Sequence, residues 1–280
     1  MAPMLSNAEA NLSWFPMSKP ADMCFDPGLD VRLLEKELSF EYGPGVAGPV
    51  VEMRRLDDIR PSLRDPRCAG SDPVYGIAMD VARREDLEDL KQRYLLFGIV
   101  AYASGRLGEE PVRSQGHIHA PAPHSGWSTP ELFEIWEGRA IVYAQEFAED
   151  EPGRCIAVAA GPGDQVVVPP GWAHCVINAD EKTRMVFGAW CERQFNFLYD
   201  GVRAHGGLAW FPLLGKNGIE WQANPRYRRL HLDVRGPRGY PELGLREDVS
   251  IYRQYQQNPE ALQWVSDPAR IASLWTVLEP

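Results

Sequence analysis

Four side chains in the middle of the sequence are of types that bind transition metals. His117 and His119 form a His-x-His pair, Glu131 follows, and His174 lies further along the chain. Residues two apart in a β-strand point to the same face, so both imidazoles of the pair can converge on one point. Three imidazoles and one carboxylate suit Fe, Mn, Ni, Co or Zn, and an octahedral ion keeps two positions for water or substrate. The set therefore predicts a divalent metal site.

The segment that carries these residues has the pattern of many short strands. From residue 95 to about residue 199, short runs rich in Val, Ile, Phe and Tyr are separated by Gly and Pro. Short strands at this spacing indicate an antiparallel sandwich or barrel, and so an all-β fold. The expected strands are 96–103, 132–137, 140–146, 154–160, 165–168, 175–178, 184–191 and 195–199.

Three helices and three regions are expected around this segment. The helices are a short one at 31–38, an amphipathic one at 83–94 and a C-terminal one at about 259–274. Residues 1–80 are rich in Pro and Gly and are expected to form an arm that packs on a barrel at 81–210. Residues 211–280 are expected to form a C-terminal extension with a helix.

Composition excludes several classes of protein. The chain has 280 residues and a net charge of −10, so a basic nucleic-acid-binding face is not expected. Its longest strongly apolar stretch, 94–102, is too short to cross a bilayer, and no secretory signal is visible. The five cysteines form no CxxC and are odd in number, which favours free thiols in a reducing cytoplasm.

Two motifs in this order resemble those of the cupin superfamily. Glycine, proline, histidine and asparagine match every defined position of the second cupin motif, at Gly163, Pro169, Gly171, His174 and Asn178. The first motif is matched by His117, His119, Glu131 and Gly138. The resemblance implies a cupin double-stranded β-helix, or jelly roll.

The first motif departs from the usual pattern at two places and leaves the fourth ligand open. Pro111 replaces the usual glycine, and the gap before Glu131 is lengthened by residues 120–130, which carry His124. Glu131 keeps the six-residue spacing to the motif glycine and is preferred. Glu134 and His124 are the alternatives.

A narrower resemblance is to the cupin-type, metal-dependent glucose-6-phosphate isomerases. It is carried by SQGHIH at 114–119, PELFEIWEG at 130–138 and VPPGWAH at 168–174, within a match over about residues 75–210. Tyr199 and His205 are similar to a tyrosine and a histidine that line the sugar site of that family.

This resemblance implies an enzyme that interconverts fructose 6-phosphate and glucose 6-phosphate, as in glycolysis and gluconeogenesis. A divalent Fe, Mn, Ni or Zn ion would be held by His117, His119, Glu131 and His174 and would stabilise an enediolate. Glu131 would move the proton between C1 and C2, with a hydride shift as the alternative. Tyr199 and His205 would hold or protonate sugar oxygens, and Ser114 with the Gly116 amide would hold the phosphate.

Other functions fit the same fold, because cupins serve many chemistries. One is an isomerase or epimerase of another sugar, and one is a non-haem iron dioxygenase. A third is a non-catalytic sugar sensor or storage protein, which has no need of four ligand-type residues. The expected partners are a small phosphosugar substrate and a second copy of the chain in a homodimer.

Overall fold

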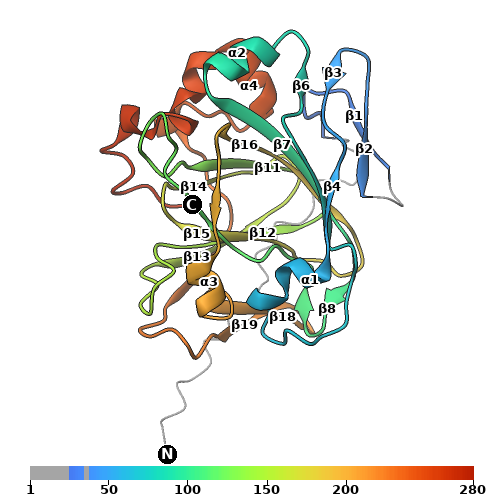
Figure 1. Cartoon of the computed structure of the whole chain (residues 1–280), viewed down its shortest axis with the longest axis vertical. Coiled ribbons are helices and arrows are strands. Elements are labelled where there is room, and N and C mark those ends of the chain that lie inside the picture. The colour runs from blue at the N-terminus through green and yellow to red at the C-terminus, as the bar shows by residue number, and fades with distance from the viewer. Residues whose placement is uncertain (1–24, 35–37) are drawn as a thin grey trace, which may run out of the picture.

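Two β-sheets face each other and form a barrel (Figure 1). The structure is a computed structural model, and it describes residues 25–34 and 38–280. One sheet has the strand order β14-β11-β16-β7-β5-β4, and the other has the order β15-β12-β13-β20. Neighbouring strands are antiparallel except for β13 and β20, which are parallel.

The strands of the six-stranded sheet are β4 (Glu52–Arg54), β5 (Tyr75–Met79), β7 (Leu95–Tyr102), β11 (Glu131–Glu137), β14 (Gln165–Val168) and β16 (Met185–Glu192). Those of the four-stranded sheet are β12 (Ala140–Gln145), β13 (Cys155–Ala160), β15 (Ala173–Asn178) and β20 (Leu232–Arg235). Five two-stranded ladders complete the sheet structure, with β3 pairing β6. Their strands are β1 (Val31–Leu34), β2 (Ser39–Tyr42), β3 (Val46–Ala47), β6 (Ala82–Arg83), β8 (Arg106–Leu107), β9 (Glu110–Pro111), β10 (Ile118–His119), β17 (Phe197–Leu198), β18 (Trp210–Gly215) and β19 (Gly218–Ala223).

The helices are short. The α-helices are α1 (Leu56–Ile59), α2 (Leu87–Gln92), α3 (Asp200–Ala204) and α4 (Ile251–Gln257). The 3-10 helices are η1 (Arg60–Ser62), η2 (Pro241–Leu243), η3 (Pro259–Val265) and η4 (Pro268–Ile271).

Both sheets are covered on their outer faces as well as packed against each other. The inner faces of the two sheets share one apolar cluster that includes Phe133, Val142 and Phe187. Outside the six-stranded sheet lie α2 and α4, and outside the four-stranded sheet lie α3 and the β18–β19 hairpin (Figure 1). This double burial explains why β7 and β16 are buried at every position and why their sequences are almost continuously apolar.

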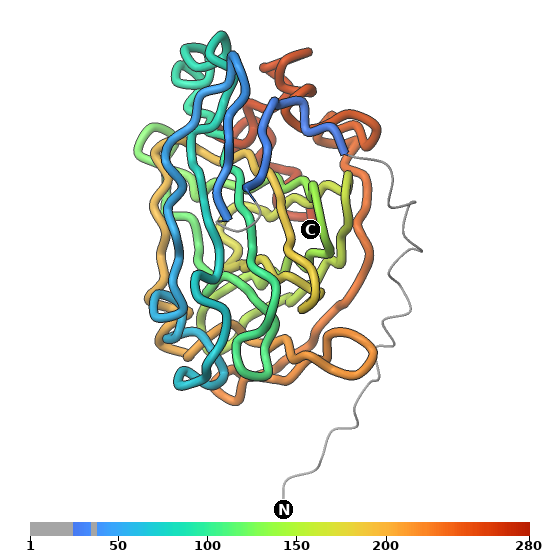
Figure 2. The backbone as a smooth tube through the Cα atoms, turned by 90° about the vertical axis from the view of Figure 1, so that its right-hand side faces the viewer, coloured from blue at the N-terminus to red at the C-terminus, as the bar shows by residue number. Residues whose placement is uncertain are grey.

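Segments before and after the expected barrel also form part of it. Strands β4 and β5 extend the six-stranded sheet, and β20 extends the four-stranded sheet. Figure 2 shows the blue N-terminal strands along one side of the barrel and the orange-red C-terminal segment along the other side and across the top. The barrel therefore draws strands from all three expected regions.

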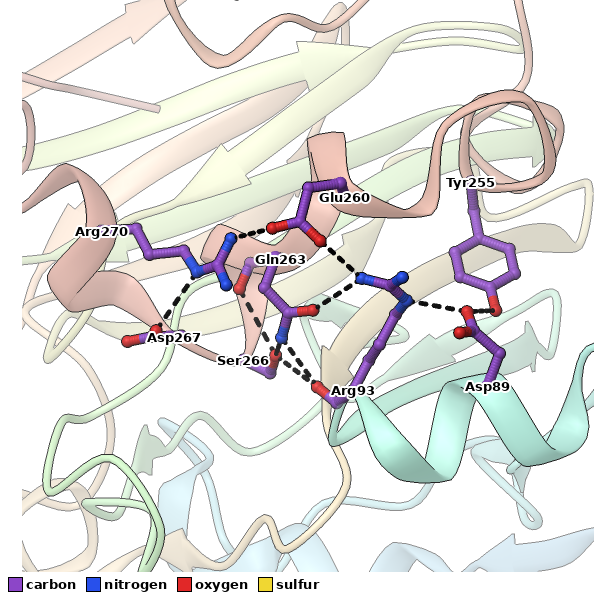
Figure 3. A network of polar contacts seen from close by, with 8 residues as sticks. All are labelled: Asp89, Arg93, Tyr255, Glu260, Gln263, Ser266, Asp267 and Arg270. Carbon is purple, nitrogen blue, oxygen red and sulfur yellow. Dashed lines mark hydrogen bonds and ion pairs between the residues drawn. The ribbon is translucent and has the colours of Figure 1, made fainter.

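The C-terminal segment is attached to α2 by a polar network (Figure 3). Arg93, at the end of α2, donates to Asp89 at 2.8 Å and to Glu260 of η3 at 2.8 Å. Its backbone carbonyl accepts hydrogen bonds from Gln263 and Ser266 at 2.9 and 2.7 Å. The contacts with Glu260, Gln263 and Ser266 join residues about 170 positions apart, so they fix the C-terminal segment on the outer face of the sheet.

The all-β fold with its C-terminal helical segment is confirmed, and the helix prediction at 31–38 was wrong. Residues 31–34 are the strand β1, paired with β2, and residues 35–37 lie outside the described part of the chain. In the C-terminal segment the α-helix is α4, which ends before the expected range of about 259–274 begins. Residues 259–271 instead form η3 and η4, because Pro259 and Pro268 each start a new turn.

Two further observations concern the expected class of protein. No helix in residues 25–34 and 38–280 is long and apolar enough to cross a membrane. The four described cysteines, Cys68, Cys155, Cys175 and Cys191, are free and buried. Cys24, expected to be a free thiol too, lies outside the described residues.

Candidate metal centre

The four expected metal ligands lie together on the inner side of the barrel. His119 belongs to β10, Glu131 starts β11 and His174 lies on β15, while His117 is bridged to His174 by backbone hydrogen bonds. Their ligand atoms all lie within 4.8 Å of one another. The Glu131 Oε2 atom is 3.3 Å from His119 Nε2 and 3.1 Å from His174 Nε2.

The second ring nitrogens of two histidines are held by the backbone. His119 Nδ1 lies 3.0 Å from the Thr129 carbonyl oxygen, and His174 Nδ1 lies 3.0 Å from the Trp172 carbonyl oxygen. A carbonyl only accepts, so each Nδ1 donates its proton and, in a neutral ring, leaves the Nε2 lone pair facing Glu131. Lone pairs and a carboxylate that face one another repel, and a cation between them removes the repulsion.

Two buried histidine ring nitrogens of this cluster lack a hydrogen-bond partner in the described structure. They are His117 Nε2 and His119 Nε2. A buried polar atom without a partner costs free energy unless an unseen group satisfies it. Three imidazoles and one carboxylate are a ligand set for a divalent transition metal, and these residues therefore fit such an ion.

The electrostatics of the cluster favour a neutral histidine and an ionised glutamate. Burial, reinforced by the neighbouring His174 and His119, holds the pKa of His117 well below its ordinary value. Burial alone would raise the pKa of Glu131, but the neighbouring imidazoles of His119 and His174 outweigh burial and lower it. These two pKa shifts leave His117 neutral and Glu131 ionised, which are the protonation states that bind a metal.

The cluster forms part of the wall of a cavity between the two sheets. The wall contains the four ligand-type residues, several apolar side chains and a set of polar side chains. The polar ones are Arg54, Tyr75, Tyr102, Ser114, Gln115 and Tyr199.

Two of the expected sugar-site residues line this cavity. The ring centroid of Tyr199, the residue before α3, lies 6.0 Å from that of His117. Burial raises the pKa of Tyr199, although the charges of Arg54 and Arg203 oppose the shift. Ser114 Oγ accepts a hydrogen bond from the Val176 amide at 3.1 Å, which leaves its own proton free to donate.

The other two expected residues are not part of the cavity wall. His205 has both ring nitrogens engaged, Nδ1 at 2.8 Å from the Gly201 carbonyl and Nε2 at 3.2 Å from Asp150, and it stacks on Tyr227. Gly116 has φ +90°, and a Cβ there would lie 2.8 Å from Leu208 Cδ1. Its place in the structure is the turn that leads into His117.

The two alternative ligands both lie away from the cluster. Residues 131, 133 and 135 of β11 face the cavity or the inner core, so Glu134 faces outward, where its Oε1 accepts the Ile251 amide hydrogen bond at 2.9 Å. His124 stacks on Tyr94 and approaches the Ser266 carbonyl at 2.9 Å and Glu192 at 3.3 Å. The lengthened loop that carries His124 thus packs on the C-terminal segment.

Sequence reasoning missed four polar residues of the cavity wall: Arg54, Tyr75, Tyr102 and Gln115. Apolar Val51 and Met53 alternate with Glu52 and Arg54, which is a strand signal. No local pattern shows that this strand joins the edge of the sheet beside the cavity. That position depends on pairing with β5.

Sequence comparisons with known proteins find a matching family model and several relatives. The family model "Glucose-6-phosphate isomerase (GPI)" matches residues 54–228. The glucose-6-phosphate isomerase of Pyrococcus furiosus is 24% identical over 198 residues, covering 69% of this chain and 96% of the relative. That of Thermococcus kodakarensis is 26% identical over 151 residues, covering 52% and 72%.

Among solved structures, the match to an oxalate oxidase has a TM-score of 0.34 and 13% identity, and it covers 45% of this chain and 54% of the oxidase chain. The match to hazelnut (Corylus avellana) vicilin has a TM-score of 0.34 and 12% identity, and it covers 46% of this chain and 33% of the vicilin chain. The family match spans more than half of the chain and includes all four ligand-type residues. The protein belongs to the cupin-type glucose-6-phosphate isomerase family.

Proposed function

We propose that this protein is a metal-dependent aldose–ketose isomerase that interconverts fructose 6-phosphate and glucose 6-phosphate. The observation that carries the proposal is the cluster of three histidines and Glu131 on a cavity wall, in a chain of this family. His117, His119, Glu131 and His174 would hold a divalent ion, with Fe, Mn, Ni and Zn as the candidates. Such an ion, when bound, polarises a sugar carbonyl and its neighbouring hydroxyl.

The proton transfer is assigned to Glu131. Its contacts with His119 and His174 both use Oε2, so Oε1 is the atom that takes the proton from one sugar carbon and returns it to the next. Glu131 is given both roles, ligand and base, because it is the single carboxylate among the described residues that line the cavity.

Tyr199 is assigned to the sugar oxygens. Its raised pKa keeps the hydroxyl protonated, and a protonated hydroxyl donates a hydrogen bond. Both ring nitrogens of His205 are engaged away from the cavity, so His205 does not contact the sugar. It follows α3 directly and helps to hold this helix, which begins directly after Tyr199. His205 is thus a positioning residue in this proposal.

The wider setting of the activity is also proposed. Ser114 lies on the cavity wall and can donate to the phosphate of the sugar, while Gly116 supplies the turn that places it and His117. The protein acts in the cytoplasm as a homodimer, and size-exclusion chromatography with light scattering tests the dimer.

The proposed function is tested by metal reconstitution. Protein stripped with EDTA is supplied in turn with Fe(II), Mn(II), Ni(II) and Zn(II) and offered fructose 6-phosphate, and a dehydrogenase reports glucose 6-phosphate. Turnover should depend on one or more metals and be lost in His174→Ala. The control is His231→Ala, which removes an exposed imidazole outside the cluster. Absence of turnover in a folded, metal-loaded protein would refute the assignment.

A further inference from the structure

The cavity wall carries one fixed positive charge among the described residues that line it. That charge is Arg54, which comes from β4, at the edge of the six-stranded sheet. Because Arg54 pairs with Tyr75 across the β4–β5 ladder, the two side chains share a face, and Tyr75, Ile77 and Met79 all line the cavity. Arg54 therefore extends the inner surface of the barrel beyond β5.

Arg54 ends a row of hydroxyl groups. The row begins at Ser114, which lines the cavity together with Tyr102, and Tyr102 stacks on Tyr75 with ring centroids 4.9 Å apart. Tyr75 in turn is the partner of Arg54 in the β4–β5 ladder. Tyr199 joins the row to the metal ligands, since it lines the same cavity as Arg54 and its ring centroid lies 6.0 Å from that of His117.

We propose that Arg54 binds the phosphate group of the sugar and makes the enzyme selective for phosphosugars over free sugars. This inference rests on the proposed isomerase function. A phosphate dianion needs a cation and several donors, and the planar guanidinium with the Ser114 and tyrosine hydroxyls provides both in one wall. A sugar whose carbonyl end lies at the histidines would place its far end toward this row.

Glu52 is the present partner of Arg54. The two side chains form an ion pair, and 65% of the Glu52 side chain is exposed against 29% of Arg54. An exposed carboxylate can leave the guanidinium for water when a phosphate arrives, because exposed ion pairs contribute little. Glu52 thus competes with the phosphate and weakens its binding.

The competing explanation is that Arg54 only stabilises the edge strand through Glu52. Arg32 provides a control, because it is also a strand residue in an ion pair with a glutamate, here Glu41 across the β1–β2 ladder, and it does not line the cavity. Removal of a merely structural ion pair should have the same consequences at both places.

The experiment compares Arg54→Met, Arg54→Lys, Glu52→Gln and Arg32→Met in the metal-loaded enzyme. With hydrogen bonds to charged groups at their usual strength, KM for fructose 6-phosphate rises about tenfold or more in Arg54→Met. The loss in kcat/KM is larger for fructose 6-phosphate than for fructose, and the KM of Arg54→Lys lies between those of the wild type and Arg54→Met. Glu52→Gln lowers KM, and Arg32→Met leaves it unchanged. Equal KM values in the wild type and Arg54→Met would overturn the inference while leaving the isomerase function intact.

A binding measurement tests Arg54 even if fructose 6-phosphate is not turned over. Inorganic phosphate is titrated calorimetrically into the metal-loaded wild type, Arg54→Met and Arg32→Met. Binding that is present in the wild type and Arg32→Met, and at least about tenfold weaker in Arg54→Met, supports the anion site. Equal binding in all three proteins, or no binding in the wild type, overturns it.

Discussion

Replacing Glu134 by glutamine removes a buried carboxyl group from the outer face of β11. Its Oε1 accepts the Ile251 amide at 2.9 Å, and its Oε2 accepts Trp136 Nε1 at 3.1 Å. Burial is the main cause that raises the pKa of Glu134 to about 8, although these hydrogen bonds oppose it. Glutamine keeps the shape and an oxygen for Ile251, but it never ionises.

The size of the effect follows from proton linkage. Below the ordinary glutamate pKa of 4.5, Glu134 is protonated in both the folded and the unfolded chain. Above it the unfolded chain loses the proton while the folded chain keeps it up to a pKa of about 8. Folding stability from this group is therefore lost as pH rises between the two values, by about 1.4 kcal/mol per pH unit. From pH 5 to pH 7 the wild type loses about 3 kcal/mol that the variant keeps.

Urea unfolding followed by circular dichroism at pH 5, 6 and 7 measures this difference. The unfolding free energy of Glu134→Gln should increase relative to that of the wild type as the pH rises from 5 to 7. The metal content of the variant should not change, because Glu134 faces away from the ligand cluster. Glu137→Gln is the control, since it removes a half-exposed carboxylate from the same strand. Stability curves of the wild type and Glu134→Gln that stay parallel from pH 5 to pH 7 would refute the reasoning.

Three further perturbations test other parts of the structure. Glu131→Gln should lose bound metal by elemental analysis whereas Glu134→Gln keeps it, and the reverse result would reassign the fourth ligand. Glu110→Gln leaves the Arg113 guanidinium buried with weakened compensation, both side chains being 3% exposed, and should lower the unfolding free energy in urea by about 3 kcal/mol. A loss below about 1 kcal/mol would show that backbone contacts suffice for Arg113. Tyr199→Phe removes one donor to the sugar and should lower kcat/KM about tenfold at unchanged thermal stability, and unaltered kinetics would exclude that contact.

The sequence by itself determined the local geometry of the site. The His-x-His spacing places His117 and His119 within reach of one point, and Gly138, Gly163 and Gly171 all adopt the positive φ that their turns need. The short apolar runs between those turns form the strands, with ends that differ from expectation by one or two residues at most positions. These features depend only on residues close together in the chain, so their patterns are visible in it.

Tertiary structure decided which faces and edges these local elements present. The alternation of side chains along a strand predicts that Glu131 and Glu134 lie on opposite faces of the sheet. The packing of α4 on one of these faces makes the face of Glu134 the outer one. Likewise, pairing with β2 makes residues 31–34 a strand, and pairing with β5 brings Arg54 to the cavity. Such contacts join residues from distant parts of the chain and depend on burial that forms only when the barrel closes, so no local pattern contains them.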